Sequence, residues 1–183
     1  FEKAIKKTFF FINNKGSRGK ELFNDSSIAV FGDSFAFCRY VNDSETWESY
    51  LEKRLKKNVF NFGVGNYGLD QSFLKYKKIK ANLNQKIILF NFVPETIARI
   101  NSYWKHYREF GNILGFKPIF YLSGKNLILK KNLLKKFMTN DQIHNKNKNV
   151  IKKFDIFYEK KFKKKKFYFP YFLNYFQNFK YFS

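Results

Sequence analysis

The stretch Ser27–Ser34, with the sequence Ser-Ile-Ala-Val-Phe-Gly-Asp-Ser, decides the fold of this chain. Four apolar residues, Ile28 to Phe31, lie between turn-forming residues, and this pattern predicts a short strand that is buried on both faces. Open α/β sheets bind their ligands in the crevice beyond the carboxyl ends of such strands. Because Ser34 follows the predicted strand directly, it is the first candidate for a reactive side chain.

The segments that follow predict a parallel α/β sheet. Asp43 to Thr46 offers a helix N-cap, and the spacing of the apolar residues after it predicts a helix to about Lys57 that packs Trp47, Tyr50, Leu51 and Leu55 on the sheet. Strand, helix and strand are then predicted at Val59–Phe62, Leu69–Leu83 and Lys86–Val93. Connections this short imply parallel strands. We expect a further helix from Pro94 towards Phe110 and a β-hairpin formed by Pro118–Leu122 and Asn126–Leu129.

The 183 residues are predicted to form three parts. Residues 1–25 are a basic lead-in, expected as a short helix followed by a loop, and residues 26–129 form a partial α/β domain. Residues 130–183 form a tail rich in Lys and aromatic residues, which could contact a membrane surface. We expect a bacterial protein in the cytoplasm or at a membrane, because the sequence shows no signal peptide and no transmembrane segment. The chain does not begin with Met, so we expect a fragment.

The net charge of +22 is compatible with nucleic-acid binding. However, only five of the 36 basic residues are Arg, the residue best suited to bidentate phosphate and base contacts. Lys, Asn, Ile, Phe and Tyr are abundant together, as the codons of an A- and T-rich genome would produce. We therefore do not expect a nucleic-acid partner. With one Cys and two His, the sequence predicts no metal site and no disulfide, and we expect no cofactor.

Two loops leave the carboxyl ends of neighbouring predicted strands: Gly32–Phe35 and Gly63–Gly68. A serine hydroxyl needs a base to accept its proton and fixed N–H donors to stabilise the oxyanion that forms. Ser34 could supply the nucleophile and one backbone donor, and the glycine-rich loop could supply a second donor. The two loops together therefore predict acyl-transfer chemistry.

The sequence resembles the SGNH, or GDSL-type, hydrolase superfamily over residues 27–122. The resemblance rests on Gly32-Asp33-Ser34, on Thr46-Trp47 and on the block Asn61–Gln71. Residues 101–122, including Ser102–Tyr107 and Gly115–Pro118, are similar to a bacterial branch associated with surface-polysaccharide or lipid-linked glycan modification.

This resemblance implies a flavodoxin-like three-layer sandwich with a parallel sheet, which we expect to be incomplete at the carboxyl end. It implies an esterase or deacylase that acts on an acylated carbohydrate, glycan or lipid-linked substrate through a Ser34 acyl-enzyme. Asp33 would support the turn, and the oxyanion donors would be Ser34, Gly65 and Asn66, since Asn tolerates a left-handed backbone. The third block of the family is replaced by Phe92–Glu95, and we place the nearby Asn91 inside the strand.

The general base of the family is the His of an Asp-x-x-His block. Asp141-Gln142-Ile143-His144 matches this pattern, in an Asn- and Lys-rich stretch that we expect to be a loop. The base would therefore be His144, oriented by Asp141, or a His beyond residue 183. His106 is expected to be a structural helix residue.

Three alternatives remain. The chain could be a catalytically inactive or glycan-binding relative of these hydrolases. Its basic aromatic tail could instead bind nucleic acid or a membrane. Finally, Gly63-x-Gly65-x-x-Gly68 matches a dinucleotide-binding pattern, but it follows the second predicted strand and lacks the acidic residue expected about 20 positions later.

Overall fold

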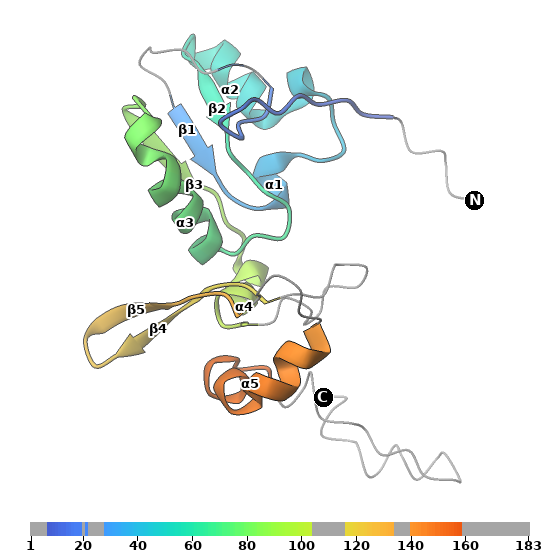
Figure 1. Cartoon of the computed structure of the whole chain (residues 1–183). Helices are drawn as coiled ribbons and strands as arrows, with labels where there is room; N and C mark the ends of the chain where they lie inside the picture. Colours follow the sequence, from blue (N-terminus) through green and yellow to red (C-terminus); the bar gives the residue numbers. More distant parts are fainter. Residues whose placement is uncertain (1–6, 20, 22–27, 104–115, 134–139, 159–183) are drawn as a thin grey trace. The chain divides into compact units, whose positions relative to one another are not determined.

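The computed structural model describes residues 7–19, 21, 28–103, 116–133 and 140–158 (Figure 1). The chain divides into two compact units, Phe1–Ile100 and Asn101–Ser183, and each has a hydrophobic core of its own. The predicted hairpin belongs to the second unit, so the division does not coincide with the boundary expected after residue 129.

The first unit is built on a three-stranded parallel sheet, which confirms the predicted α/β class. Its strands are β1 (Ile28–Phe31), β2 (Val59–Asn61) and β3 (Ile87–Phe90), in the order β2-β1-β3. Val30 of the central strand lies opposite Asn61 on one side and Leu89 on the other. All four residues of β1 are buried, as the apolar run predicts.

Helices pack on both faces of this sheet (Figure 1). On one face, Ile28 and Val30 form a core with Ala36 and Val59, against which Trp47 and Leu51 of helix α2 (Trp47–Leu55) pack. On the other face, the core of Ala29, Phe31, Phe60 and Phe62 is covered by Tyr76 and Ile79 of helix α3 (Leu69–Ile79). Phe31 lies at the centre of this second core, 5.1 Å from the ring of Phe62 and 5.5 Å from that of Tyr76.

Helix α2 presents a different face to the sheet from the one predicted. Trp47 and Leu51 pack on the core, but Tyr50 and Leu55 are exposed, and the residue that is buried between Trp47 and Leu51 is Glu48. The buried stripe therefore contains a carboxyl group where the apolar pattern indicated Tyr50. The helix begins after Thr46, whose hydroxyl accepts the Ser49 N–H at 3.2 Å.

Several predicted boundaries change in the first unit. Helix α3 is followed by a 3₁₀ turn, η2 (Lys80–Asn82), and the strand expected to reach Val93 ends at Phe90. The expected loop after Ser34 begins as a single helical turn, α1 (Ser34–Phe37), before the turn η1 (Asp43–Glu45). The helix expected from Pro94 is the turn η3 (Pro94–Thr96) followed by α4 (Ile97–Ile100), and residues 104–115 lie outside the described part.

The amino-terminal lead-in contains no helix among its described residues 7–19, so the short helix predicted there is not found in this part of the segment. The chain turns instead at Asn13, whose side-chain Oδ1 accepts the N–H groups of Lys15 and Ser17. Gly16 has φ 78°, a conformation that ordinary side chains disfavour. After this turn Arg18 forms an isolated bridge to Asn61, so the lead-in adds to the edge of the sheet.

The second unit contains the predicted hairpin, β4 (Ile119–Ser123) paired antiparallel with β5 (Asn126–Lys130). Helix α5 (Asn140–Phe154) corrects the loop that we expected around residues 141–144. Phe116, Ile151 and Tyr158 form the core of this unit, and buried Asp155 accepts the Tyr103 N–H at 2.9 Å. No helix in the described part of the chain is long and apolar enough to span a bilayer.

Two glycines allow the sheet to approach α1 closely. A Cβ at Gly32 would lie 2.8 Å from the Cβ of Ala36, and a Cβ at Gly63 would lie 2.5 Å from the backbone N of Phe37. Neither distance is tolerated between real atoms. The buried Asn61 side chain reinforces this contact, because its Nδ2 donates to the Ala36 carbonyl and its Oδ1 accepts the Gly63 N–H. The two loops that follow β1 and β2 are therefore locked together around Ala36.

We expect Gly63→Ala to lower the free energy of unfolding by about 2 kcal/mol or more, because the added methyl group must displace backbone atoms. Gly65→Ala is the matched control, since its new Cβ would meet only the Arg39 side chain, at 3.0 Å. We expect the control to change stability by less than about 1 kcal/mol. Urea unfolding of both variants tests this, and equal losses would contradict the proposed role of the close approach.

Candidate active site

Ser34 lies where the sequence predicts it, at the carboxyl end of the central strand. It is the first residue of α1, it is partly exposed, and it lines a pocket of about 530 Å³. This pocket is formed by Ser34, Phe35, Cys38, Arg39, Tyr40, Val41, Glu45, Trp47 and Asn66. We call it the Ser34 pocket. Its walls combine aromatic rings with one cation and one carboxylate, so it can accept a ligand that has both apolar and polar parts.

Asp33 is buried beneath this serine and organises the turn. Its Oδ1 accepts the Phe35 N–H at 2.9 Å, and its backbone carbonyl accepts the Phe37 N–H at 2.9 Å. Its Oδ2 lies 3.5 Å from Nη1 of Arg99, which also donates to the Tyr67 carbonyl at 3.0 Å. Asp33 is therefore placed to support the turn, and Arg99 links it to the glycine-rich loop.

Asn66 has a left-handed backbone, a conformation that Asn tolerates, with φ 66°, and it lines the same pocket as Ser34. The loop that carries Asn66 is fixed to the first loop because the Val64 N–H donates to the Gly32 carbonyl at 3.0 Å. Gly65 does not line the pocket; it faces the Arg39 guanidinium instead. Of the predicted donors, the structure brings Ser34 and Asn66 to one pocket.

Asn91 is not inside the third strand, which corrects our expectation. β3 ends at Phe90, and Asn91 is the first residue beyond it. Its N–H donates to the Phe31 carbonyl at 2.8 Å, and its own carbonyl lies against Gly32. The third loop therefore begins beside the Gly-Asp-Ser turn, although Asn91 does not line the Ser34 pocket.

Asp141 and His144, the predicted orienting acid and base, both belong to helix α5 of the second unit. Their side chains, and the whole of His106, lie outside the described part of the chain. The base assignment therefore stays a prediction.

Cys38, which lines the Ser34 pocket, contacts a buried acid that sequence reasoning missed, Glu48 of helix α2. The Cys38 thiol is 3.8 Å from Oε2 of Glu48, and Oε1 of Glu48 is buried with no hydrogen-bond partner among the described residues. Burial raises the pKa of Glu48 to about 7. Burial, and then the Glu48 carboxylate, raise the pKa of Cys38 above its usual value. Because a thiol is nucleophilic as the thiolate, these shifts favour Ser34 over Cys38 as the nucleophile.

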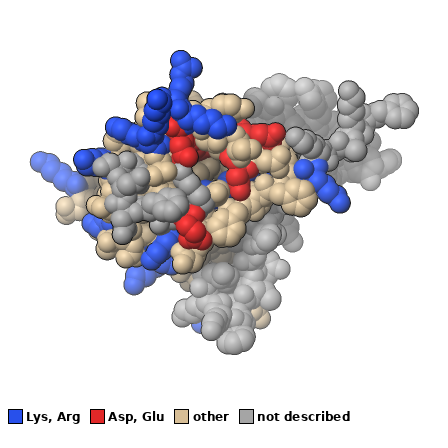
Figure 2. Space-filling model, turned by 90° about the horizontal axis from the view of Figure 1, so that it is seen from above, with Lys and Arg blue, Asp and Glu red and all other residues tan. Residues whose placement is uncertain are grey.

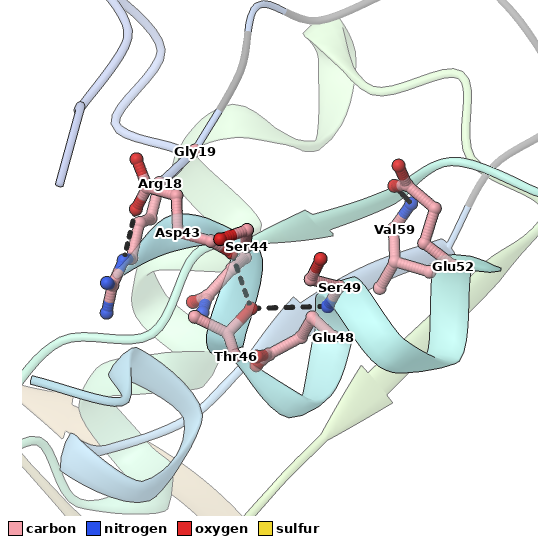
Figure 3. Close-up of a pocket in the computed structure, with 10 residues that line it drawn as sticks. Arg18, Gly19, Asp43, Ser44, Thr46, Glu48, Ser49, Glu52 and Val59 are labelled. Carbon is pink, nitrogen blue, oxygen red and sulfur yellow. Dashed lines mark hydrogen bonds and ion pairs between the residues drawn. The ribbon is translucent and has the colours of Figure 1, made fainter. Parts of the chain in front are cut away.

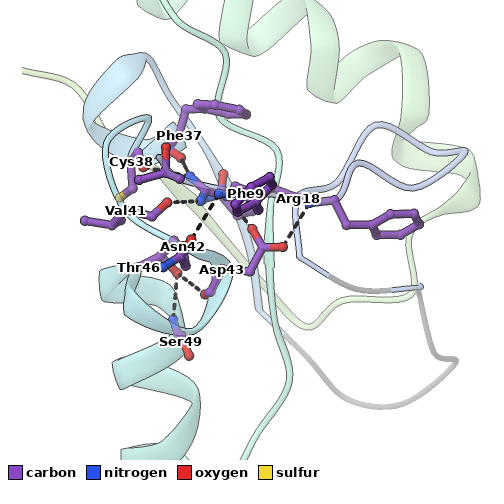
Figure 4. A network of polar contacts seen from close by, with 12 residues as sticks. Phe9, Arg18, Phe37, Cys38, Val41, Asn42, Asp43, Thr46 and Ser49 are labelled. Carbon is purple, nitrogen blue, oxygen red and sulfur yellow. Dashed lines mark hydrogen bonds and ion pairs between the residues drawn. The ribbon is translucent and has the colours of Figure 1, made fainter. Parts of the chain in front are cut away.

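The second missed residue is Arg18, which holds the segment that forms one wall of the pocket (Figure 4). Its guanidinium donates to the carbonyl groups of Phe37, Cys38 and Val41, and its Nε lies 2.7 Å from Oδ1 of Asp43. One signal was present in the sequence: Arg is rare in this Lys-rich chain, and a planar group with several donors suits such a role better than an ammonium group does.

A second, smaller pocket of about 290 Å³ lies between the lead-in and α2 (Figure 3). Asp43, Glu48 and Glu52 line it together with three hydroxyl residues, Ser44, Thr46 and Ser49. Asp43 is paired with Arg18, and Glu52 accepts the Val59 N–H at 2.9 Å. Among the described residues, no group of three or more His, Cys, Asp or Glu is placed to hold a metal ion.

We compared the chain with protein-family models, with curated proteins and with solved structures, and none of them matches it.

The burial of Glu48 predicts a pH-dependent stability. Because its folded-state pKa of about 7 exceeds its ordinary value of 4.5, the folded state binds the proton more tightly than the unfolded state does. Stability should therefore fall as the pH rises from about 4.5 to 7, by about 1 to 3 kcal/mol. Glu48→Gln should remove this fall and be more stable than the wild type at about pH 8.

Urea unfolding of both proteins at about pH 5 and about pH 8 measures this effect. Glu21→Gln is the matched control, because Glu21 is exposed, and its pH dependence should follow that of the wild type. The assignment is wrong if Glu48→Gln keeps the pH slope of the wild type.

Proposed function

We propose that this chain is a serine ester hydrolase or deacylase of the SGNH type, built on a flavodoxin-like sheet. The observation that carries the proposal is the position of Ser34: it follows the central strand and shares one pocket with Asn66, whose backbone is left-handed. A nucleophile and a loop that can supply N–H donors on two neighbouring strands are the arrangement that acyl transfer needs.

In the proposed reaction, Ser34 Oγ attacks the carbonyl carbon of an ester, and a base accepts the hydroxyl proton. The tetrahedral oxyanion is stabilised by the backbone N–H groups of Ser34 and Asn66. Collapse of this intermediate breaks the bond to the alcohol, which takes the proton from the base and leaves an acyl-enzyme. Water then attacks the acyl group with the help of the same base, and the acid and free Ser34 are released.

The pocket supports an acylated carbohydrate, glycan or lipid-linked substrate. Phe35, Tyr40 and Trp47 provide aromatic surface beside Ser34, on which an acyl chain or the apolar face of a sugar can pack. Arg39 and Glu45 provide charged groups for the hydroxyl or phosphate groups of the alcohol.

The base that we propose is His144, oriented by Asp141. The chain has two histidines, and only this one has an acidic residue three positions before it on the same helix.

Ser34 is expected to react with a fluorophosphonate probe, and intact-protein mass spectrometry followed by peptide mapping locates the label. Ser34→Ala should abolish labelling and lower the hydrolysis of p-nitrophenyl acetate by about a thousandfold or more. Ser44→Ala is the matched control, because Ser44 lies in the smaller pocket, and it should keep both activities. A folded protein that is neither labelled nor active would favour the alternative of an inactive, glycan-binding relative.

His144→Ala is expected to lower ester turnover by about a hundredfold or more, since a general base contributes on that scale. His106→Ala is the control and should keep the activity of the wild type. Measurement of turnover against pH adds an independent readout, because the wild type should lose activity as a group with a pKa near that of His becomes protonated. Equal turnover in both His variants would exclude His144 as the base.

A further inference from the structure

Exposed aromatic side chains lie in the wall of the Ser34 pocket and on the lead-in segment beside that wall. Phe35 is 62% exposed and Tyr40 is 75% exposed, and both line the pocket. Phe9 is 75% exposed and Phe11 is 51% exposed, on the lead-in segment. We call these four residues the aromatic rim. Large exposed apolar side chains that gather in one place mark an interaction surface more often than isolated ones do.

Hydrogen bonds hold the lead-in beside segment 39–43, which contributes Arg39, Tyr40 and Val41 to the wall of the pocket. Thr8 Oγ1 donates to the Arg39 carbonyl at 3.3 Å, and the Phe9 N–H donates to Oδ1 of Asn42 at 3.0 Å. The Phe11 N–H donates to Oδ2 of Asp43 at 2.9 Å. The segment 8–11 therefore runs beside the segment 39–43, which contains Tyr40.

Phe10, between Phe9 and Phe11, is held by contacts within the first unit. Its ring packs on Phe37 at 5.1 Å and beneath the Arg18 guanidinium at 5.1 Å, although it is still 45% exposed. Phe9 and Phe11, one residue to either side, are more exposed than this anchored ring.

Exposed cations accompany the rim. Lys7, Lys15 and Arg39 are exposed, whereas Asp43 is paired with Arg18 and the Glu45 carboxylate accepts the Asn42 N–H at 2.8 Å. Aromatic rings flanked by lysine and arginine match the interface of an anionic bilayer, where rings enter the headgroup region and cations meet lipid phosphates.

We propose that the aromatic rim docks the first unit on an anionic lipid bilayer, with the mouth of the Ser34 pocket at the lipid surface. The docking itself does not depend on catalysis; the consequence that a lipid-anchored ester would enter the pocket from the bilayer rests on the proposed function. The rim is also distinct from the carboxyl-terminal tail, in which the sequence analysis placed membrane contact.

A bilayer fits the rim better than a nucleic acid does. Three of the four rings are Phe, which carries no polar group for base recognition, and Phe35 and Tyr40 continue into a pocket that also contains Trp47 and Val41. Nucleic-acid binding calls for a continuous cationic stripe. Figure 2 shows that, on the face in view, acidic side chains gather near the middle and Lys and Arg lie towards the margins.

The test uses the full chain with vesicles of phosphatidylcholine that contain about 30 mol % phosphatidylglycerol, and with pure phosphatidylcholine vesicles. Co-sedimentation measures the partition coefficient of the wild type, of Phe9→Thr/Phe11→Thr and of a control, Leu122→Thr/Leu127→Thr. The control changes two exposed apolar residues that pair across the hairpin of the second unit. Circular dichroism verifies that all three proteins are folded.

We expect the wild type to prefer the anionic vesicles, the rim variant to partition roughly tenfold more weakly, and the control to stay within about twofold of the wild type. The proposal is overturned if the wild type does not bind anionic vesicles, if the rim variant binds as the wild type does, or if the control loses as much. It is also overturned if the rim variant loses binding to a uridine oligonucleotide while vesicle binding is unchanged.

Two readouts separate this inference from the proposed function. Ser34→Ala should bind vesicles as the wild type does, so failure of fluorophosphonate labelling with intact vesicle binding removes only the proposed function. The rim variant should keep hydrolysis of soluble p-nitrophenyl acetate, because Phe9 and Phe11 do not line the Ser34 pocket. Its loss of activity should be confined to esters embedded in vesicles.

Discussion

The close approach of α1 to two glycine-bearing loops is the constraint on which the first unit depends. A side chain at Gly32 or Gly63 would overlap Ala36 or the backbone of Phe37, so only glycine lets both loops reach this turn. Asn61 then joins the loops by bonding to Ala36 on one side and Gly63 on the other. Because Ser34 begins α1, the packing that builds the sheet edge also fixes the position of the candidate nucleophile.

Hydrogen bonds from Arg18 hold the segment that forms one wall of the Ser34 pocket. Segment 38–42, between α1 and η1, contains no helix or strand, so its carbonyl groups and that of Phe37 at the end of α1 need partners from elsewhere. Arg18 supplies them from the lead-in and balances its own charge with Asp43. The lead-in, to which the sequence analysis assigned no functional residue, therefore supports both the pocket and the aromatic rim.

The sequence predicted the structural elements that a few neighbouring residues specify. The buried run Ile28–Phe31, the glycines after it and the hairpin turn at Gly124 are each specified by a few neighbouring residues, and the structure confirms these elements. The sequence pattern did not predict features that depend on residues distant along the chain. Glu48 is buried because α2 turns it towards Cys38, and the role of Arg18 depends on carbonyl groups about 20 residues away, so neither follows from spacing along the chain.

The proposed chemistry also requires a base that is not a His of the first unit. Residues 1–100 contain no His, so a His base for Ser34 must come from beyond Ile100, either His144 or a His beyond residue 183. Proton transfer requires the base within hydrogen-bond reach of the serine hydroxyl. In this mechanism the first unit therefore supplies the nucleophile and the oxyanion donors, and the base follows it in the sequence.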